Sequence, residues 1–429
     1  MSLLIKGGLV VDPSQHLEDP RDLLVEGGKI VALEPPGQIP EEGRRVISAS
    51  GLVVTPGLVD MHVHLREPGE EYKETIESGT RAAIQGGFTG VACMPNTKPV
   101  NDNAAVTRLI LTQAKAAGYA RVYPVGAVSV GSQGQSLSEY GDLKAAGVVA
   151  VTDDGRPVSN AMLMRRALEY ARTFDLPVIS HCEDLDLAAD GVMHEGPVSL
   201  QLGLKGIPAA AEEVMVYRDL TLARLTGARL HIAHVSTAGS VAIIRLAKAM
   251  GLPVTAETAP HYFTLTEEAV RGYDTHAKVN PPLRTDMDVQ AIKEALRDGT
   301  LDAVACDHAP HSSLEKEVEF TAAAFGLIGL ETSLGLTLKL VHNGALNLSQ
   351  AIGALSTNPA AILGITGGTL KKEAPADITL IDLNREWTVD ANTFASKSRN
   401  CPFNGWTLKG KAVMTILGGK VVWQDKGRG

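Results

Sequence analysis

The chain has 429 residues, of which 21% are charged and 4% aromatic, and its 40 basic and 49 acidic residues give a formal net charge of −9 at pH 7. A negative net charge without a long run of lysine or arginine does not favour binding to nucleic acid or to an anionic membrane. No apolar stretch of about 18 residues is free of charges and Gly or Pro breaks, and the N-terminus enters a strand pattern directly. We therefore expect a cytoplasmic protein without a transmembrane helix or signal peptide.

Three segments near the two ends of the chain share a Gly-Gly pair followed by a β-branched pair, at 5–11, 25–31 and 416–422. A Gly-Gly pair between apolar runs indicates a β-hairpin. We therefore expect a small β-sandwich domain built from residues 1–54 and 369–429. The alternative is that these segments are unrelated surface hairpins.

The apolar run 52–63 ends in Asp60-Met61-His62-Val63, and His64 follows directly. On a β-strand alternate side chains share a face, so His62 and His64 project together. Two imidazoles on one face can bind one cation. A lone histidine on an apolar strand is more often a satisfied core residue, so the assignment depends on whether the rest of the chain completes a site.

Seven further apolar, β-branched segments follow, and most of them end in a polar or metal-binding residue. They lie at 88–94, 122–128, 148–153, 177–181, 229–234, 254–258 and 303–307. Between them are helical patterns such as 161–173, 212–225, 241–250 and 288–297. Continuous apolar runs that alternate with helices are typical of buried parallel strands. We expect an α/β fold, a (β/α)8 TIM-type barrel over residues 55–368, with its active site at the carboxyl ends of the strands.

Six side chains that can bind a metal lie at or near these strand ends: His62, His64, Asp153, His181, His234 and Asp307. An Asp at a strand end often caps the next helix, but six such residues together favour a metal site. The four cysteines lack any CxxC spacing and are expected to be reduced and buried. They are Cys93, Cys182, Cys306 and Cys401. Cys182 and Cys306 each adjoin a proposed ligand, so the alternative to buried packing is that either thiol approaches the metal.

The chain resembles dihydroorotase, and more narrowly the class I bacterial form within the amidohydrolase superfamily. The resemblance runs from about Gly51 to Glu331 through motifs in the same order: Asp60 to Gly69, Met94-Pro95-Asn96-Thr97, Thr152-Asp153-Asp154-Gly155, His181-Cys182-Glu183-Asp184, His234-Val235-Ser236-Thr237, Asn280-Pro281-Pro282-Leu283-Arg284 and Asp307-His308-Ala309-Pro310-His311. Two departures are visible. Ala324-Phe325-Gly326 stands where Pro-Phe-Gly is common, and Tyr262 stands where a second His is frequent.

The resemblance implies reversible hydrolysis of L-dihydroorotate to N-carbamoyl-L-aspartate, a step of de novo pyrimidine (UMP) biosynthesis. We expect two Zn²⁺ ions per subunit, one on His62, His64 and Asp307 and the other on His181 and His234. A metal-activated hydroxide would attack the ring amide. Asp153 is expected as the bridging carboxylate and Asp307 as the proton shuttle.

The substrate is a carboxylate, so its pocket needs a cation and polar groups. Arg66 follows His64 by two residues and offers a planar fork that matches a carboxylate. Five other residues match substrate-contacting positions of the family: Asn96, Asn280, His311, Phe325 and Gly326. The alternatives are that each Asn, which adjoins a Pro, is a turn former, and that His311 caps a helix or is solvated.

Two alternatives stay open. Hydantoinases and allantoinases share the barrel and the HxH motif, but typically bridge their metals with a carboxylated lysine at the end of the fourth strand. Here that strand, 148–153, contains no lysine, and Lys144 precedes it. A non-catalytic dihydroorotase-like partner of aspartate carbamoyltransferase would have lost metal ligands, whereas all six positions are occupied here. We expect a homodimer. A complex with aspartate carbamoyltransferase would be compatible with activity, and it stays open.

Overall fold

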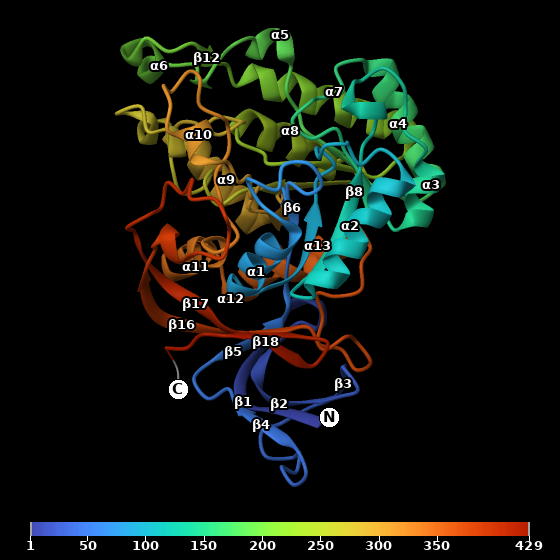
Figure 1. Ribbon diagram of the computed structural model, residues 1–429, viewed down its shortest axis with the longest axis vertical. Coiled ribbons are helices and arrows are strands. Elements are labelled where there is room, and N and C mark those ends of the chain that lie inside the picture. Colours follow the sequence, from blue (N-terminus) through green and yellow to red (C-terminus); the bar gives the residue numbers. More distant parts are fainter. Residues whose placement is uncertain (1, 428–429) are drawn as a thin grey trace.

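The computed structural model describes residues 2–427 and contains two large sheets (Figure 1). One is a parallel sheet of eight strands that curls into a barrel and is surrounded by helices. The other is a mixed sheet of eight strands that combines the blue N-terminal and red C-terminal segments at the opposite end of the molecule.

The barrel strands follow one another in chain order, and every neighbouring pair is parallel. They are β6 (Leu58–Val63), β7 (Phe88–Cys93), β8 (Arg121–Gly126), β9 (Ala150–Val151), β10 (Val178–Ser180), β13 (Leu230–Ile232), β14 (Val254–Thr258) and β15 (Ala303–Val304). The first and last strands meet where the His64 amide donates to the His308 carbonyl at 2.8 Å. The predicted eight-stranded α/β barrel is therefore confirmed.

Helices cover the outside of the barrel (Figure 1). The predicted helix 161–173 is present with those bounds as α4 (Ala161–Thr173), and Asn160 caps it by accepting from the Met162 and Leu163 amides. The other helices are α1 (Ile76–Gln85), α2 (Ala104–Ala117), α3 (Tyr140–Ala146), α5 (Leu185–Ala188), α6 (Pro197–Leu202), α7 (Ala210–Thr226), α8 (Ala238–Ala249), α9 (Asp286–Asp298), α10 (Ser313–Lys316), α11 (Ser333–His342), α12 (Leu348–Ile352) and α13 (Asn358–Leu363).

The mixed sheet is assembled from both ends of the chain and joined where β5 pairs antiparallel with β16. Its path is β18-β17-β16-β5-β1-β2-β3, with β4 also paired to β1. The bounds are β1 (Ser2–Asp12), β2 (Leu17–Glu26), β3 (Lys29–Glu34), β4 (Arg45–Ser48), β5 (Val53–Pro56), β16 (Ile378–Thr388), β17 (Thr407–Leu417) and β18 (Lys420–Gln424). Division of the chain into domains at 54/55 and 368/369 stays a prediction.

Two of the three Gly-Gly pairs form hairpin turns, between β2 and β3 and between β17 and β18. The turn expected at Gly7-Gly8 is wrong, because β1 continues through it with a bulge where the pairing to β2 shifts. The close approach of β5 explains the second glycine of this pair: a Cβ on Gly8 would lie 2.6 Å from Val54 Cγ2.

The run 52–63 is divided between the two sheets: β5 belongs to the mixed sheet and β6 to the barrel. Gly57 lies between the two strands, where a Cβ would meet Thr89 Oγ1 at 2.1 Å. A separate pair, β11 (Met193–His194) and β12 (Gly206–Ile207), lies outside both sheets. All four cysteines are free and buried, as expected. Within residues 2–427, no helix has the length and apolar character needed to cross a membrane.

Candidate metal centre and substrate pocket

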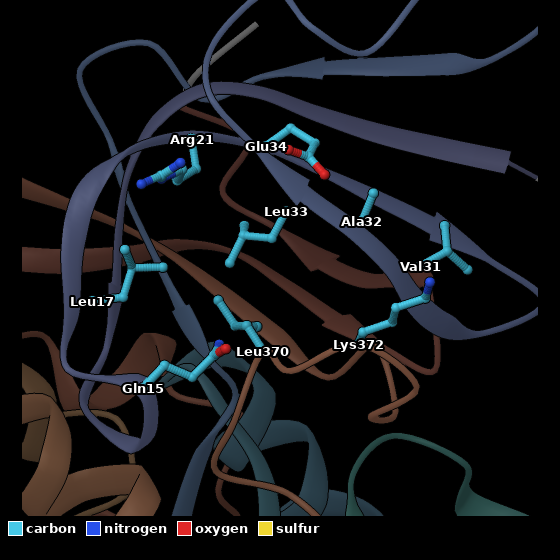
Figure 2. A pocket seen from close by; sticks show the side chains of 9 residues that line it. All are labelled: Gln15, Leu17, Arg21, Val31, Ala32, Leu33, Glu34, Leu370 and Lys372. Carbon is cyan, nitrogen blue, oxygen red and sulfur yellow. The ribbon is translucent and has the colours of Figure 1, made fainter.

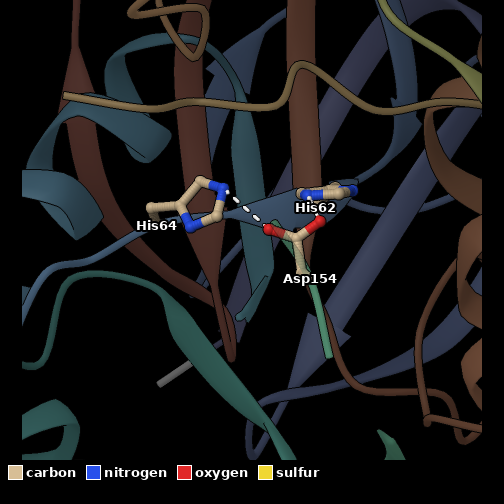
Figure 3. A group of neighbouring side chains, drawn as sticks. All are labelled: His62, His64 and Asp154. Atoms are coloured by element: carbon tan, nitrogen blue, oxygen red, sulfur yellow. Dashed lines mark ion pairs between the residues drawn. The ribbon is translucent and has the colours of Figure 1, made fainter. Parts of the chain in front are cut away.

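Four histidines from the carboxyl ends of three barrel strands surround the carboxylate of Asp154. The Asp154 oxygens lie 3.3 Å from His62 Nε2 and 3.5 Å from His64 Nε2 (Figure 3). They also lie 3.7 Å from His181 Nδ1 and 3.7 Å from His234 Nε2. The cluster thus forms two groups of potential ligands, His62 with His64 and His181 with His234, and Asp154 is common to both.

The expectation that Asp153 bridges the two groups is wrong. Its carboxylate accepts hydrogen bonds from the Ser129 amide, at 3.1 Å, and from the Ser129 hydroxyl. Strand β9 ends at Val151, two residues earlier, and a shift of one residue in an extended chain exchanges which side chain faces the site. Asp153 therefore fixes the loop after β8, and Asp154 occupies the position between the histidines.

Asp307 lies beside the first histidine pair, where it was expected. Its Oδ1 is 3.1 Å from His64 Nε2 and 3.7 Å from His62 Nε2. Three residues of the site have left-handed backbone conformations: Arg66 at φ 59°, His234 at φ 36° and Asp307 at φ 47°. Such conformations cost non-glycine residues about 1–3 kcal/mol each and persist where the surroundings enforce them, often at functional sites.

Neighbouring side chains fix the orientation of the first histidine pair. His62 Nδ1 is 2.9 Å from Glu257 Oε1, and His64 Nδ1 is 2.8 Å from Asn96 Oδ1. Because these oxygens accept, each Nδ1 carries a proton, and each Nε2 faces Asp154. His62 Nε2 and His234 Nδ1 are buried and have no hydrogen-bond partner. Imidazole nitrogens and carboxylate oxygens arranged in this way fit Zn²⁺.

The electrostatics of the cluster also suit a cation. Burial alone would raise the pKa of Asp154, but the charge of His62 outweighs it and holds this pKa well below its usual range. Burial likewise opposes protonation of His181, yet Asp154 and Glu183 raise its pKa to about 10. The buried Asp154 carboxylate therefore favours positive charge beside it. Protons on the histidines supply this charge in the absence of a metal, and a bound divalent ion would displace those protons.

A cavity of about 240 Å³ opens over the cluster. All six residues expected to contact substrate line it: Arg66, Asn96, Asn280, His311, Phe325 and Gly326. His64, Asp154, His181, His234 and Asp307 line the same cavity. The structure thus brings the two predicted sets together, while contact of the first set with a substrate stays a prediction.

Arg66 is buried at the cavity wall and held by two neighbours. Its Nε donates to the Pro310 carbonyl at 3.2 Å, and its Nη2 lies 3.3 Å from His311 Nε2. Burial, followed by the charges of Arg66 and Lys73, lowers the pKa of His311 to about 3. His311 is therefore neutral near pH 7 and accepts from the guanidinium, so Arg66 supplies the positive charge of this wall.

Sequence reasoning missed two carboxylates behind the histidines. Glu257 lies between His62 and His231, with its Oε2 3.3 Å from His231 Nε2. Glu183 Oε2 accepts from Asn280 Nδ2 at 3.2 Å and lies 3.3 Å from His181 Nε2. Glu183 lies within the motif His181-Cys182-Glu183-Asp184, so its position beside a ligand is a local sequence signal. Glu257 has no local signal, because only the barrel brings it next to His62.

A wider groove of about 460 Å³ lies on the mixed sheet (Figure 2). It contains no histidine, cysteine or aspartate, so it lacks the kind of ligand set that the barrel cavity contains. Its lining residues are Gln15, Leu17, Arg21, Val31, Ala32, Leu33, Glu34, Leu370 and Lys372.

Comparison with solved structures shows that the fold is similar to that of hydantoinases and dihydropyrimidinases. L-hydantoinase (dihydropyrimidinase) from Arthrobacter aurescens superimposes with a TM-score of 0.88 at 26% identity, covering 98% of this chain and 96% of that one. Dihydropyrimidinase from Brevibacillus agri gives a TM-score of 0.85 at 25% identity, covering 99% and 96%.

Comparison of sequences is more specific. The model of the dihydro-orotase-like family matches residues 51–240. A protein of Geobacter metallireducens named dihydroorotase is 60% identical over 424 residues, covering 99% of this chain and 100% of its own. One of Geobacter sulfurreducens with the same name is 61% identical over 422 residues, covering 98% and 99%. The chain therefore belongs to the dihydroorotase family.

Proposed function

We propose that this protein is a dihydroorotase, which hydrolyses L-dihydroorotate reversibly to N-carbamoyl-L-aspartate in pyrimidine biosynthesis. The observation that carries the proposal is the shared cavity, in which buried Arg66 faces the same space as the histidines and Asp307. Full-length relatives at 57–61% identity bear the same name. A cyclic amide with a carboxylate needs both halves of such a pocket: a cation for the carboxylate and a centre that activates water.

We propose that the metal centre holds two zinc ions, one on His62, His64 and Asp307 and the other on His181 and His234, with Asp154 shared between them. Bound zinc would lower the pKa of a water molecule and polarise the ring carbonyl. His64 is oriented for this role by Asn96, and His62 by Glu257. The relevant nitrogen and oxygen atoms of each histidine pair and Asp154 lie within 4.8 Å of one another.

Asp307 is proposed to move the proton. Burial would raise the pKa of Asp307, but the charges of His62 and His64 hold it below its usual range, so the group is ionised. As a carboxylate it can accept the proton of the attacking water and return it to the ring nitrogen when the amide bond breaks. Arg66 would meanwhile hold the substrate carboxylate with its planar fork, which fixes the ring above the histidines.

Neither of the two alternative functions is favoured. Lys144, the lysine nearest in sequence to the end of β9, is exposed on α3. Asp154 already provides the carboxylate that a carboxylated lysine supplies in hydantoinases. A non-catalytic partner of aspartate carbamoyltransferase would have no need of a complete set of buried ligands.

We further propose a cytoplasmic location and a homodimer; a complex with aspartate carbamoyltransferase is compatible with both. Size-exclusion chromatography with light scattering tests the dimer. A particle of twice the mass of one chain is expected, and a monomer at micromolar concentration would contradict it.

The function itself is tested by comparing two substrates that differ only in the carboxylate. Zinc-loaded protein would be assayed with dihydroorotate and with dihydrouracil, which has the same ring without that group. We expect kcat/KM for dihydroorotate to be larger by at least about 100-fold, because loss of the carboxylate partner of a buried guanidinium costs about 3 kcal/mol. Equal values for the two compounds would contradict the proposal.

A further inference from the structure

Two lysines, Lys278 and Lys316, are buried behind the part of the cavity wall formed by Phe325 and Gly326. Each of these two residues is only 2% exposed to solvent. Among residues 2–427, neither has a carboxylate oxygen within ion-pair distance of its Nζ. Burial lowers the pKa of Lys316 to about 7 and that of Lys278 to about 8. Burying an amine is costly unless its N–H groups are satisfied, so the partners of these two groups are informative.

Both lysines donate to backbone carbonyls of a single segment, residues 320–326. Lys316 Nζ donates to the Ala324 carbonyl at 2.8 Å and to the Gly326 carbonyl at 3.0 Å. Lys278 Nζ donates to the Phe320 carbonyl at 2.8 Å and to the Thr321 carbonyl at 3.0 Å. A lysine supplies at least two N–H donors whether charged or neutral, so these contacts persist through either protonation state.

The same lysines place the aromatic ring and the glycine of this segment. Lys278 Nζ lies 4.6 Å from the centre of the Phe325 ring, and the Gly326 amide donates to the Lys278 carbonyl at 2.8 Å. Gly326 has φ 126°, and a Cβ there would lie 2.7 Å from Ala309 Cβ. The segment is therefore packed tightly against the loop after β15, with little space for an alternative backbone path.

The segment is also joined to another residue of the cavity. The Gly326 carbonyl accepts a second hydrogen bond, from Asn400 Nδ2 at 3.0 Å. The Asn400 Oδ1 in turn accepts from the His311 amide at 3.3 Å. The positions of Phe325, Gly326 and His311 are thus set together, and removal of the lysine donors would leave four carbonyls of the segment without these partners.

We propose that Lys278 and Lys316 are positioning residues that hold segment 320–326 in the conformation to which substrate binds. The inference rests on the proposed function, in which Phe325 and Gly326 contact the substrate. Because the histidines are held by β6, β10 and β13, loss of the lysines should weaken substrate binding and leave the metal centre in place. If segment 320–326 is already ordered before the substrate binds, binding does not have to order it, and the affinity is higher for that reason.

The test uses Lys316→Met and Lys278→Met, which keep length and apolar volume but remove the donors. The matched control is Lys339→Met, since Lys339 is exposed on α11 and also lies over an aromatic ring, that of Trp406, at 5.2 Å. For each variant, KM and kcat for dihydroorotate, zinc content and amide hydrogen exchange of 320–326 would be measured. We expect KM to rise by at least about tenfold, the equivalent of one net hydrogen bond, with kcat and zinc content close to those of the control and faster exchange in the segment.

The outcomes separate this inference from the proposed function. Unchanged KM and unchanged exchange in both variants would overturn the inference, as would parallel losses of kcat and zinc, which indicate general structural damage. If neither variant folds, exchange in the wild-type protein decides: amides of 320–326 as fast as an unstructured peptide would overturn it. Failure of the wild type to hydrolyse dihydroorotate would instead overturn the proposed function, while the exchange result still reports on the lysines.

Discussion

Replacing the two adjacent aspartates one at a time gives a sharp test of the metal centre. Asp154→Asn keeps the shape of the side chain but removes the charge that lies 3.3–3.7 Å from four imidazoles. At an effective dielectric constant of about 20, one such charge pair is worth about 5 kcal/mol. Changing residues that merely support a ligand weakens metal binding by about 10–100-fold. We therefore expect Asp154→Asn to weaken zinc binding by more than about 100-fold, with a matching loss of turnover.

Asp153→Asn is the matched control, because it makes the same chemical change one residue away. It weakens the hydrogen bonds from the Ser129 amide and hydroxyl, which should lower the free energy of unfolding by about 1–3 kcal/mol. Zinc content after dialysis, measured by atomic emission, and urea unfolding monitored by circular dichroism distinguish the two variants. Loss of zinc in Asp153→Asn with full zinc in Asp154→Asn would refute the assignment of Asp154.

The remaining predictions concern individual steps. His62→Ala should abolish tight zinc binding and nearly all activity while the barrel stays folded by circular dichroism; near wild-type turnover would contradict the metal assignment. Asp307→Asn should lower kcat by at least about 10²–10⁴-fold, and an unchanged rate and pH profile would remove Asp307 from the mechanism. Arg66→Lys should raise KM for dihydroorotate, because a point charge cannot reproduce the planar fork; an unchanged KM would exclude that contact. Apo-protein given zinc in CO₂-free buffer should regain full activity, with Lys144→Ala close to neutral, whereas a requirement for bicarbonate would indicate a carboxylated lysine.

The barrel was predictable because its strands are buried on both faces. Parallel strands in this position read as continuous apolar runs, and the predicted strand 88–94 agrees to within one residue with β7 (Phe88–Cys93), all of whose residues are buried. The helix 161–173 was predictable for a related reason, since an Asn cap precedes an amphipathic pattern. In both cases, the structural signal lies within a few neighbouring residues.

The misassigned features depend on geometry that sequence patterns do not contain. Strand β9 is only two residues long, so the alternation of faces could not be extended from it to Asp153 and Asp154. Gly7 and Gly8 match the hairpin pattern, yet β1 continues through them with a bulge and also pairs with β5. A local pattern predicts a turn or a bulge equally well until the neighbouring strand is known.

The supporting residues were missed because their partners lie far away in the chain. Glu257 meets His62 across 195 residues, and Glu183 meets Asn280 across 97. Lys278 and Lys316 gave no sequence signal, because an isolated lysine is ordinarily exposed. Sequence reasoning therefore found most of the side chains that surround the cavity and few of those that hold them in place.

One paired measurement decides whether the cavity is a zinc-dependent site that holds a carboxylate-bearing ring. Zinc content would be determined on the same preparation whose turnover of dihydroorotate, hydantoin and allantoin is measured side by side. We expect two zinc ions per chain and efficient hydrolysis of dihydroorotate alone. Full activity after complete removal of metal, or faster hydrolysis of hydantoin or allantoin than of dihydroorotate, would contradict it.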